Sequence, residues 1–265
     1  MKRYSDLDKR MKNYEAIPKT KLMRRTPVVI RIDGRAFHTF TQNLRKPFDT
    51  ILMEAMQDTT KYLCENIPGC VLGYTQSDEI SLVLVDYDTL DKSAWFGYEV
   101  QKMCSIVASM TTMRFNKIFA RKVDEAYTTL IFSEGEDYLR ALIDAIDMGA
   151  CFDARVFNIP KEEVTNYIYW RQADASKNSI QMVGHANFTE EEMHKKSVND
   201  IQDMLMLEKS INWNDFTVSQ KRGTCVIKKP VDKNNKKEKW VIDYDIPIFK
   251  GFARNYVNEL VFYEE

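Results

Sequence analysis

The sequence predicts an α/β (α+β) protein with a ferredoxin-like sheet backed by two helices. Three observations carry this prediction. Four runs rich in apolar and β-branched residues have the composition of strands, two long patterns of helical periodicity separate the first run from the second and the third from the fourth, and only four residues separate the second run from the third. With right-handed crossovers, this order of elements folds most simply into such a sheet.

The first half of the predicted core begins with the strand VVIRID (28–33). Apolar residues then recur at helical spacing over residues 48–64, and this helix ends near Pro68. CVLGYT (70–75) and ISLVLVDY (80–87) follow as two strands with so short a connection that we expect a hairpin.

The second half of the core is dominated by a long helix. Ser93 is expected to cap it, and its apolar face begins at Phe96. A connecting stretch that includes TTLIF (128–132) and a short helix (136–147) lead to CFDARVFNI (151–159), which alternates as a strand. The resulting ferredoxin-like arrangement is also that of polymerase and cyclase palms, although a fold alone does not give a function.

Beyond the core, the chain is predicted to be mostly helical. A helix over residues 162–178 follows Pro160, and Thr189 to Glu192 matches the capping box S/T-x-x-E, which we expect to open another helix through about Leu207.

The C-terminal region is predicted to form a β-hairpin. GTCVIKK (223–229) and KWVIDY (239–244) are its strands, and DKNNKKEK (232–239) is its turn. Because no repeat, low-complexity tract or Gly/Ser linker divides the chain, we expect one domain with a palm-like core at about 26–160 and a helical and C-terminal part at about 161–265.

Charge is balanced overall but uneven along the chain. The 38 Lys and Arg residues nearly cancel the 39 Asp and Glu residues. Residues 1–25 carry nine basic and three acidic residues, and residues 217–240 carry eight and two, so each segment is net +6 by subtraction. Such runs are usually solvated faces, but two of them also fit a polyanion held on both sides of a site.

Cysteine and histidine usage indicates a reduced protein without zinc. The five cysteines form no CxxC pair, their number is odd, and His38, His185 and His194 have no ligand spacing with any of them. With no N-terminal apolar export segment and no apolar run near 18 residues, we expect a cytoplasmic protein without a membrane partner.

Acidic residues at two strand ends are the strongest functional signal. Asp33 ends the first strand, while Asp78 and Glu79 lie between the two strands of the hairpin, which should place Asp78 beside the end of the first strand. A carboxylate there is costly to desolvate unless it is paired or binds a cation. Three such groups could hold two Mg²⁺ ions against a triphosphate, although residues alone allow a strand-end cap or a surface turn equally well.

The segment GRAFHTFTQNLRKP (34–47) follows the first acid and suits a loop that passes over phosphates, because it carries basic and hydroxyl groups. Arg31 and Arg35 could instead pair with the acids. His38 is expected to make at most a nucleotide contact. Phe37, Phe40 and Phe48 are expected to be core residues.

At RIDGRAFHTF (31–40) and QSDEISLV (76–83) the sequence resembles the tRNA(His) guanylyltransferase family, in particular its bacterial and archaeal 3′-to-5′ RNA polymerase relatives. WRQADASKNSI (170–180) and INWNDFTVSQKRGTCVIKK (211–229) resemble two further family segments in the right order. The resemblance extends over about residues 4–230.

This resemblance implies nucleotide addition to the 5′ end of tRNA, with the opposite strand as Watson-Crick template. ATP or GTP first activates the 5′-monophosphate, and the 3′-OH of the incoming nucleotide then attacks the activated phosphate. The implied cofactor is two Mg²⁺ ions, the implied partners are tRNA, ATP, GTP and other NTPs, and the implied assembly is a homotetramer.

The resemblance also implies roles for individual residues. Asp33 and Asp78 match the metal carboxylates, Gly34 matches the residue whose backbone oxygen joins them, and Glu79 matches the adjacent essential acid. The expected nucleotide-binding residues are Arg31, Gly34, Arg35, Ala36, Phe37, His38, Lys46, Ser77, Lys102 and Asn178. From the C-terminal basic segment we expect tRNA contacts by Lys221, Arg222, Lys228 and Lys229.

Two departures from the eukaryotic pattern favour the repair-type relatives. Residues 176–179 read Ser-Lys-Asn-Ser where the eukaryotic enzymes have His-Ile-Asn-Asn, and Glu99 stands in place of a family arginine. Both departures argue against strict recognition of tRNA(His).

Two other classes of function are open from the residues alone. A palm-fold nucleotide cyclase would use the same carboxylates and form a cyclic product from NTP without RNA. A non-catalytic RNA-binding module would gain nothing from three converging carboxylates, which repel the RNA backbone.

Overall fold

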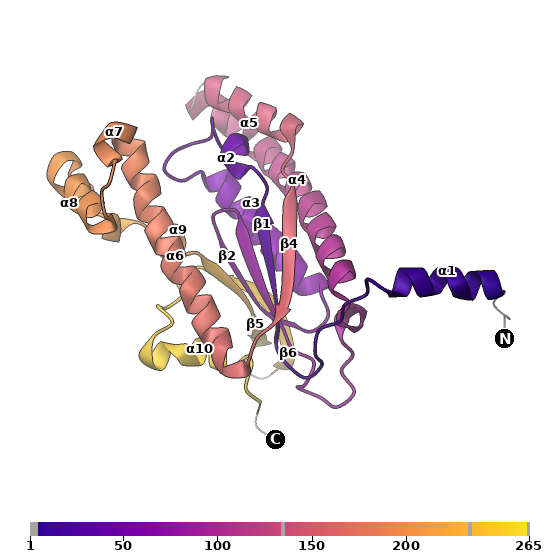
Figure 1. Ribbon diagram of the computed structural model, residues 1–265. Coiled ribbons are helices and arrows are strands. Elements are labelled where there is room, and N and C mark those ends of the chain that lie inside the picture. Colours follow the sequence, from indigo (N-terminus) through magenta and orange to yellow (C-terminus); the bar gives the residue numbers. More distant parts are fainter. Residues whose placement is uncertain (1–4, 134–135, 233–234, 264–265) are drawn as a thin grey trace.

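The structure is a computed structural model that describes residues 5–133, 136–232 and 235–263 (Figure 1). Within these residues, six strands form one sheet in the order β4-β1-β3-β2-β5-β6, and every neighbouring pair is antiparallel. The strands are β1 (Val28–Gly34), β2 (Cys70–Gln76), β3 (Glu79–Leu84), β4 (Phe152–Asn158), β5 (Thr224–Asp232) and β6 (Asn235–Asp243). The α-helices are α1 (Asp6–Ala16), α2 (Phe37–Phe40), α3 (Thr50–Asn66), α4 (Val100–Ser133), α5 (Glu136–Met148), α6 (Lys161–Asn187), α7 (Glu190–Met193), α8 (Val198–Lys209), α9 (Val218–Arg222) and α10 (Asn255–Asn258), with 3₁₀ turns η1 (Trp95–Tyr98), η2 (Trp213–Asp215) and η3 (Gly251–Arg254).

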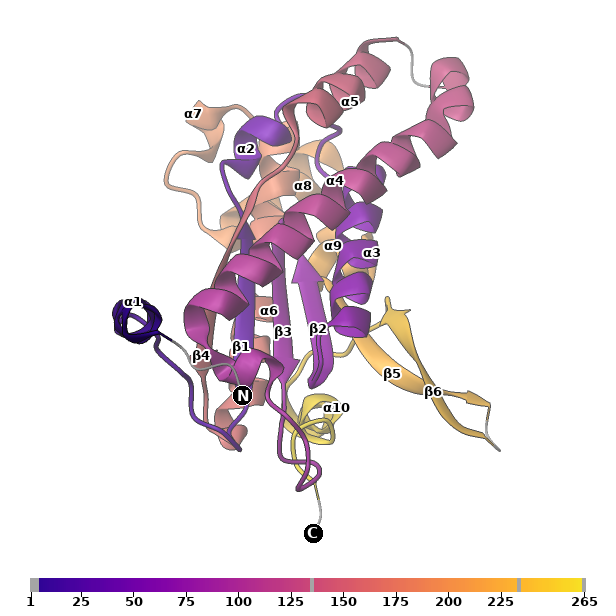
Figure 2. The same cartoon turned by 90° about the vertical axis from the view of Figure 1, so that its right-hand side faces the viewer.

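The predicted ferredoxin-like core is confirmed. α3 connects β1 to β2, α4 and α5 connect β3 to β4, and the four strands have the order β4-β1-β3-β2. Figure 2 shows α3 and α4 together on one face of the sheet. The C-terminal hairpin β5–β6 is also confirmed, and it extends the same sheet because β5 pairs with β2 at Gly73, Tyr74 and Thr75.

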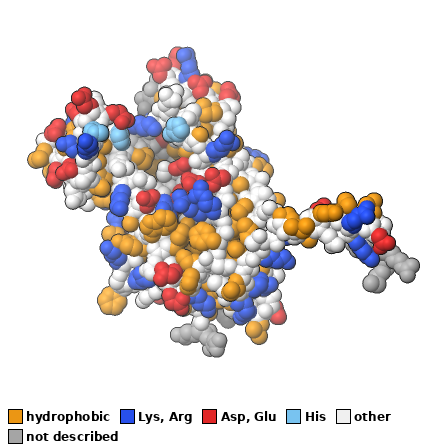
Figure 3. Space-filling view, viewed as in Figure 1, with side chains coloured by type: hydrophobic (Ala, Val, Ile, Leu, Met, Phe, Trp, Pro, Cys, Tyr) orange, Lys and Arg blue, Asp and Glu red, His pale blue; other side chains and the backbone are white. Residues whose placement is uncertain are grey.

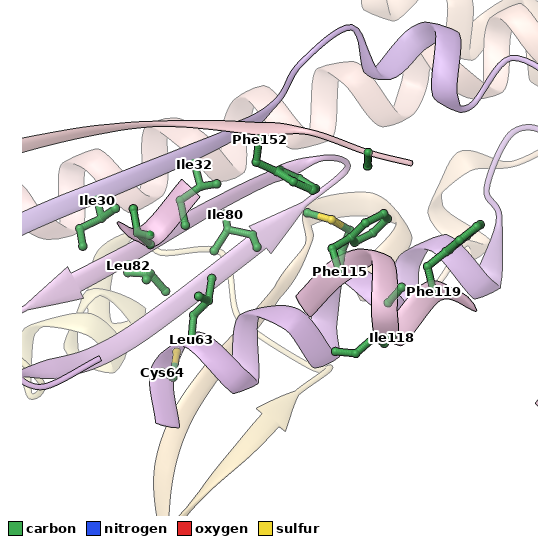
Figure 4. Close-up of a cluster of buried hydrophobic side chains, with 14 of the residues drawn as sticks. Ile30, Ile32, Leu63, Cys64, Ile80, Leu82, Phe115, Ile118, Phe119 and Phe152 are labelled. Carbon is green, nitrogen blue, oxygen red and sulfur yellow. The ribbon is translucent and has the colours of Figure 1, made fainter. Parts of the chain in front are cut away.

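The main hydrophobic core lies between this face of the sheet and the two helices (Figure 4). Alternate strand residues point towards the helices, as the two-residue period of a strand requires. The fully buried residues of this core include Ile30, Ile32, Ile80, Leu82, Leu63 and Phe115. Phe37 and Phe40 pack on Phe115 at ring distances of 5.9 and 5.8 Å, so their prediction as core residues is confirmed.

The opposite face of the sheet packs on α6. Val29, Leu72 and Val83 meet Val164 and Ile168 of this helix in a second core. Figure 1 shows α6 crossing the face at an angle to β4. Side chains of β4 near the carboxyl end of β1 therefore reach solvent, and Asp153 and Arg155 are exposed.

The predicted start of the long helix was wrong. Ser93 does not cap it, and Phe96, Gly97 and Tyr98 have positive φ angles, which a right-handed helix cannot continue. The N-terminal segment packs beside this break: the N–H of Val100 donates to the carbonyl of Thr20, and Lys21 forms a β-bridge with Glu99. α4 then continues to Ser133, so TTLIF (128–132) is helical and does not form a connection.

The predicted helix from Thr189 to Leu207 is two helices. The capping box of Thr189 and Glu192 is present, but α7 ends at Met193, and Lys195 has a φ of 58°. A second capping box, formed by Ser197 and Asp200, begins α8.

The helix predicted over residues 162–178 is longer than expected, because α6 continues to Asn187. α1 begins within the basic N-terminal segment, has no buried residue and projects from the body of the molecule (Figure 1). The predicted turn 232–239 is shorter than expected, since β6 begins at Asn235, and residues 233–234 lie outside the described residues. The five cysteines are free, and no described helix has both the length and the apolar character needed to span a membrane.

Candidate active site

The end of β1 and the β2–β3 turn form the centre of the candidate site. Register pairs Ile32 with Ile80, so Gly34 lies beside the two-residue turn of Ser77 and Asp78. A Cβ atom added to Gly34 would lie 2.8 Å from Oδ2 of Asp78 and 2.3 Å from the ring of Phe37. Only glycine therefore allows this close approach. The predicted hairpin is confirmed with Asp78 in its turn, but Glu79, which was also expected in the connection, is the first residue of β3.

The electrostatics of the turn favour a cation. Burial raises the pKa of Asp78 above its ordinary value, and the negative charge of Asp33 raises this pKa further. Ser77 Oγ donates to Asp78 Oδ1 at 3.0 Å, which acts in the opposite direction. A positive charge between the two carboxylates would relieve their repulsion.

The donor set fits Mg²⁺ when bound phosphate is included. The carboxylates of Asp33 and Asp78 and the carbonyl of Gly34 are hard oxygen ligands, which Mg²⁺ prefers. In the described part of the chain, no group of three or more His, Cys, Asp or Glu side chains is placed to hold a metal ion. Triphosphate oxygens and water would therefore complete the coordination, as is usual for Mg²⁺ in nucleotide sites.

Glu79 has a different environment from Asp78. It is 4% exposed, and Arg171 donates to both of its oxygens, from Nε to Oε1 at 2.7 Å and from Nη2 to Oε2 at 2.9 Å. Nη2 of Arg31 lies 2.9 Å from the same Oε2 and 3.4 Å from Oδ2 of Asp33. Burial raises the pKa of Glu79, and the hydrogen bonds from Arg171 lower it. Two guanidinium groups thus occupy the oxygens that a metal ion would need.

A cavity of about 450 Å³ opens next to the turn and gathers most of the predicted nucleotide-binding residues. α2 and the loop after it form one wall, and Met182 of α6 contributes to the other. The predicted site residues that line this cavity are Gly34, Ala36, Phe37, His38, Lys46, Ser77 and Asp78.

A neighbouring cavity of about 400 Å³ unites three groups from distant parts of the sequence, Lys46, Ser77 and Asn178. Nζ of Lys46 donates to the carbonyl of Thr41 at 3.0 Å and is exposed, so it is free to turn towards a phosphate. An ammonium, a hydroxyl and an amide are suitable donors for a triphosphate.

Three predicted nucleotide-binding residues lie outside these cavities. Lys102 is in the first turn of α4, where its Nζ lies 4.8 Å from the ring centroid of Phe96. Arg31 pairs with acids, which is the alternative that the sequence left open. The side chain of Arg35 is exposed, while its N–H donates to the carbonyl of Cys151 at 2.8 Å.

The predicted tRNA-binding residues occupy two places. Lys221 and Arg222 are in the last turn of α9, and Nζ of Lys221 lies 5.8 Å from the ring centroid of Trp213. On β5, Lys228 lies over Trp240 at 5.3 Å, and Lys229 forms an ion pair of 2.9 Å with Asp243. Lys228 and Lys229 are neighbours on a strand and therefore face opposite sides of the hairpin.

Asp49 was missed by the sequence analysis. It lines the cavity of about 450 Å³, is 4% exposed and caps α3 by accepting from the N–H of Leu52 at 2.9 Å. The hydroxyl of Tyr138 also donates to it at 2.6 Å. An aspartate just before a helical pattern is a recognisable N-cap, but its contact with Tyr138 is 89 residues away in sequence and leaves no local signal.

A larger cavity of about 680 Å³ lies between α3 and α9 and contains none of the predicted site residues. It is lined by Glu54, Asp58 and Lys122, among others, and Lys122 pairs with both acids at 2.9 and 3.0 Å. One ammonium is therefore shared by two carboxylates, which leaves this cavity with a net negative charge and makes it a poor site for a triphosphate.

Comparison with known proteins identifies close relatives of the chain. The model of the tRNAHis guanylyltransferase (Thg1) family matches residues 8–160. A probable tRNA(His) guanylyltransferase of Dictyostelium discoideum is 28% identical over 255 residues, which cover 89% of this chain and 91% of that protein. A bacterial tRNA(His) guanylyltransferase-like protein has been solved in complex with ATP and with GTP. The ATP complex has a TM-score of 0.80 and 42% identity and covers 97% of this chain and 99% of that one. The GTP complex has a TM-score of 0.79 and 40% identity and covers 98% and 100%.

Proposed function

The chain belongs to the tRNA(His) guanylyltransferase family of nucleotidyltransferases, and we propose that it is a template-dependent enzyme that adds nucleotides in the 3′-to-5′ direction to the 5′ end of truncated tRNA. The observation that carries this proposal is the pair of cavities at the β2–β3 turn, which gather Lys46, Ser77 and Asn178 beside Asp78. The similar bacterial protein that was solved with ATP and with GTP supports a nucleotide as ligand of this chain.

In the proposed reaction, Lys46, Ser77 and Asn178 would hold the triphosphate, and Asp33, Asp78 and the carbonyl of Gly34 would hold two Mg²⁺ ions. Bound there, the ions would neutralise the phosphates and stabilise the attacking and leaving oxygens. The 5′-monophosphate of the RNA is first activated with ATP or GTP. The 3′-OH of the incoming nucleotide then forms a bond to the activated 5′ phosphorus, the activating group leaves with the bonding electrons, and the hydroxyl proton passes to water.

Template use is supported by the residues that replace the eukaryotic His-Ile-Asn-Asn run. Ser176 donates to the carbonyl of Gln172 at 3.1 Å, and Ser179 is 3% exposed and accepts from Nε1 of Trp213 at 3.0 Å. Both hydroxyls are therefore engaged within the protein, while Asn178 lines the cavity. Pairing with the opposite base can select the nucleotide without a protein group that reads the sequence.

The proposal divides the chain into a palm-like catalytic core at about 26–160 and a part at about 161–265 that contacts tRNA through Lys221, Arg222, Lys228 and Lys229. The cytoplasmic location and the homotetramer stay predictions.

The activity can be tested with purified protein, Mg²⁺, labelled NTPs and a tRNA transcript that lacks its first 5′ nucleotide. The proposal predicts label at the 5′ end of the RNA. A cyclic product from NTP without RNA would indicate a cyclase, and label at the 3′ end would contradict the direction of addition.

Templating requires a second experiment. A 5′-triphosphorylated, truncated tRNA is offered with each of the four opposing bases, and the products are sequenced. We expect the complementary nucleotide in every case. Addition of G whatever the opposing base, or only to tRNA(His), would contradict templated repair.

A further inference from the structure

The sheet face beside Asp33 is open to solvent on the side that α6 leaves uncovered. Register places Asp153 of β4 next to Asp33 and Arg155 next to Arg31. The side chains of Arg155 and Asp153 are 56% and 57% exposed. Figure 3 shows acidic, basic and hydrophobic side chains next to one another in the middle of this face.

Arg155 is held only loosely on this face. Its Nη1 lies 3.9 Å from Oδ2 of Asp33, and its Nη2 lies 3.6 Å from Oδ1 of Asp153. Both distances exceed that of a good charge-assisted hydrogen bond. The guanidinium is therefore available to an anion that approaches Asp33.

A row of aromatic rings runs beside these charges. Phe157 of β4 contacts Tyr167 of α6 at a centroid distance of 5.8 Å, and Tyr167 contacts Trp170 at 6.0 Å. Trp170 is 54% exposed, although tryptophan has the largest side chain of all amino acids. Its ring is also supported by the guanidinium of Arg171 at 4.4 Å, which favours a fixed orientation.

The exposed ring is connected to the predicted metal site through buried ion pairs. Arg171 contacts both Trp170 and Glu79, and Arg31 contacts both Glu79 and Asp33. Arg171 and Glu79 are each 4% exposed. The position of Trp170 relative to Asp33 is therefore set by the packed interior and not by a surface loop.

We propose that Trp170 is the stacking platform for the outermost base pair at the RNA end, which is the pair that the added nucleotide forms with its template base, and that Arg155 binds a phosphate of this end. This inference rests on the proposed function and adds the position of the RNA end on the protein surface. A duplex end presents a flat base pair, which stacks well on an aromatic side chain, and a phosphate, which suits an arginine.

Stacking is tested with an RNA hairpin whose 5′-terminal nucleotide is 2-aminopurine paired with U, because stacking changes the fluorescence of this base. Trp170→Phe keeps a ring, Trp170→Leu keeps only an apolar side chain, and Phe252→Leu alters a control residue that is 98% exposed. We expect the wild type, Trp170→Phe and Phe252→Leu to change the fluorescence alike. Trp170→Leu should lose the change and bind the hairpin about tenfold more weakly or worse, with ATP affinity unaltered.

The phosphate contact is tested with Arg155→Ala in the same hairpin assay across a salt series. The slope of log affinity against log salt should fall by about one, while the fluorescence change is retained. Arg155→Lys should restore most of the slope.

The outcomes separate this inference from the proposed function. Wild-type RNA affinity and fluorescence in Trp170→Leu would overturn the stacking platform, as would a loss of ATP affinity without loss of RNA affinity. An unchanged salt slope in Arg155→Ala would overturn the phosphate contact. A wild-type protein that binds the hairpin but adds no nucleotide to truncated tRNA would instead contradict the proposed function.

Discussion

Asp78 and Glu79 are neighbours in the sequence but lie in opposite surroundings. Asp78 is in the turn at the end of the sheet, lines the cavity of about 450 Å³ and has a pKa raised by burial and by Asp33. Glu79 begins β3, points towards α6 and is paired with Arg171 and Arg31. Two neighbouring carboxylates therefore differ in their surroundings: Asp78 has no basic partner among the residues that the structure describes and can accept a cation, whereas the charge of Glu79 is already paired with two arginines.

The largest expected effect is on catalysis at Asp78. We predict that Asp78→Ala, like Asp33→Ala, loses nucleotide addition by several orders of magnitude and keeps its fold, because each change removes a proposed metal ligand. The measurement is the single-turnover rate on truncated tRNA together with thermal unfolding. A folded variant with near wild-type addition would remove that residue from the metal site.

At Glu79 the dominant effect should be on stability. Glu79→Ala removes the buried partner that Arg171 and Arg31 share and leaves Arg171 with Asp174 alone among the described acidic residues. Breaking a buried ion pair in this way costs about 3–5 kcal/mol of unfolding free energy. Glu79→Gln, which keeps the shape and can still accept a hydrogen bond, should lose less. Urea denaturation measures both variants. Wild-type stability of Glu79→Ala with no activity would instead identify Glu79 as a catalytic residue.

The same distinction between engaged and available charges applies to the C-terminal hairpin. Replacing both Lys228 and Lys229 with alanine should lower the salt slope of tRNA binding by about two if both contact phosphates. Because Lys229 is paired with Asp243, a fall of only one would indicate that Lys228 alone makes such a contact. The matched control replaces Lys117 and Arg121, two exposed residues of α4, and should leave the slope unchanged.

The smallest effect concerns pH. Because the pKa of Asp78 is raised in the folded protein, its contribution to stability is fully present below its ordinary pKa and is lost as the pH rises through the raised value. Without metal, Asp78→Asn should therefore be slightly more stable than the wild type at neutral pH, and the difference should shrink on acidification. Thermal unfolding across pH measures this difference, and a gap that widens in acid would contradict the assignment.

The sequence was sufficient for the parts of the site that depend on local pattern. Alternation and periodicity predicted the four core strands and their order, and the short connection between two of them predicted that Asp78 would lie beside the end of β1. The aromatic residues Phe37 and Phe40 were likewise recognisable as core.

The sequence was not sufficient where distant residues compete for a group. Glu79 and Arg171 are 92 residues apart, so nothing local indicates that they form a buried ion pair. Likewise, the break before α4 lies beside the distant N-terminal segment, where the N–H of Val100 donates to the carbonyl of Thr20. Helical periodicity alone could not predict that break.

The difference between Asp78 and Glu79 is tested most directly by metal-dependent nucleotide binding. Calorimetry of a non-hydrolysable ATP analogue, with and without Mg²⁺, is compared for the wild type, Asp78→Asn and Glu79→Gln. The proposed assignment predicts that Asp78→Asn loses the gain in affinity that Mg²⁺ provides, whereas folded Glu79→Gln keeps it. Loss of the Mg²⁺ effect in Glu79→Gln and its retention in Asp78→Asn would contradict this assignment.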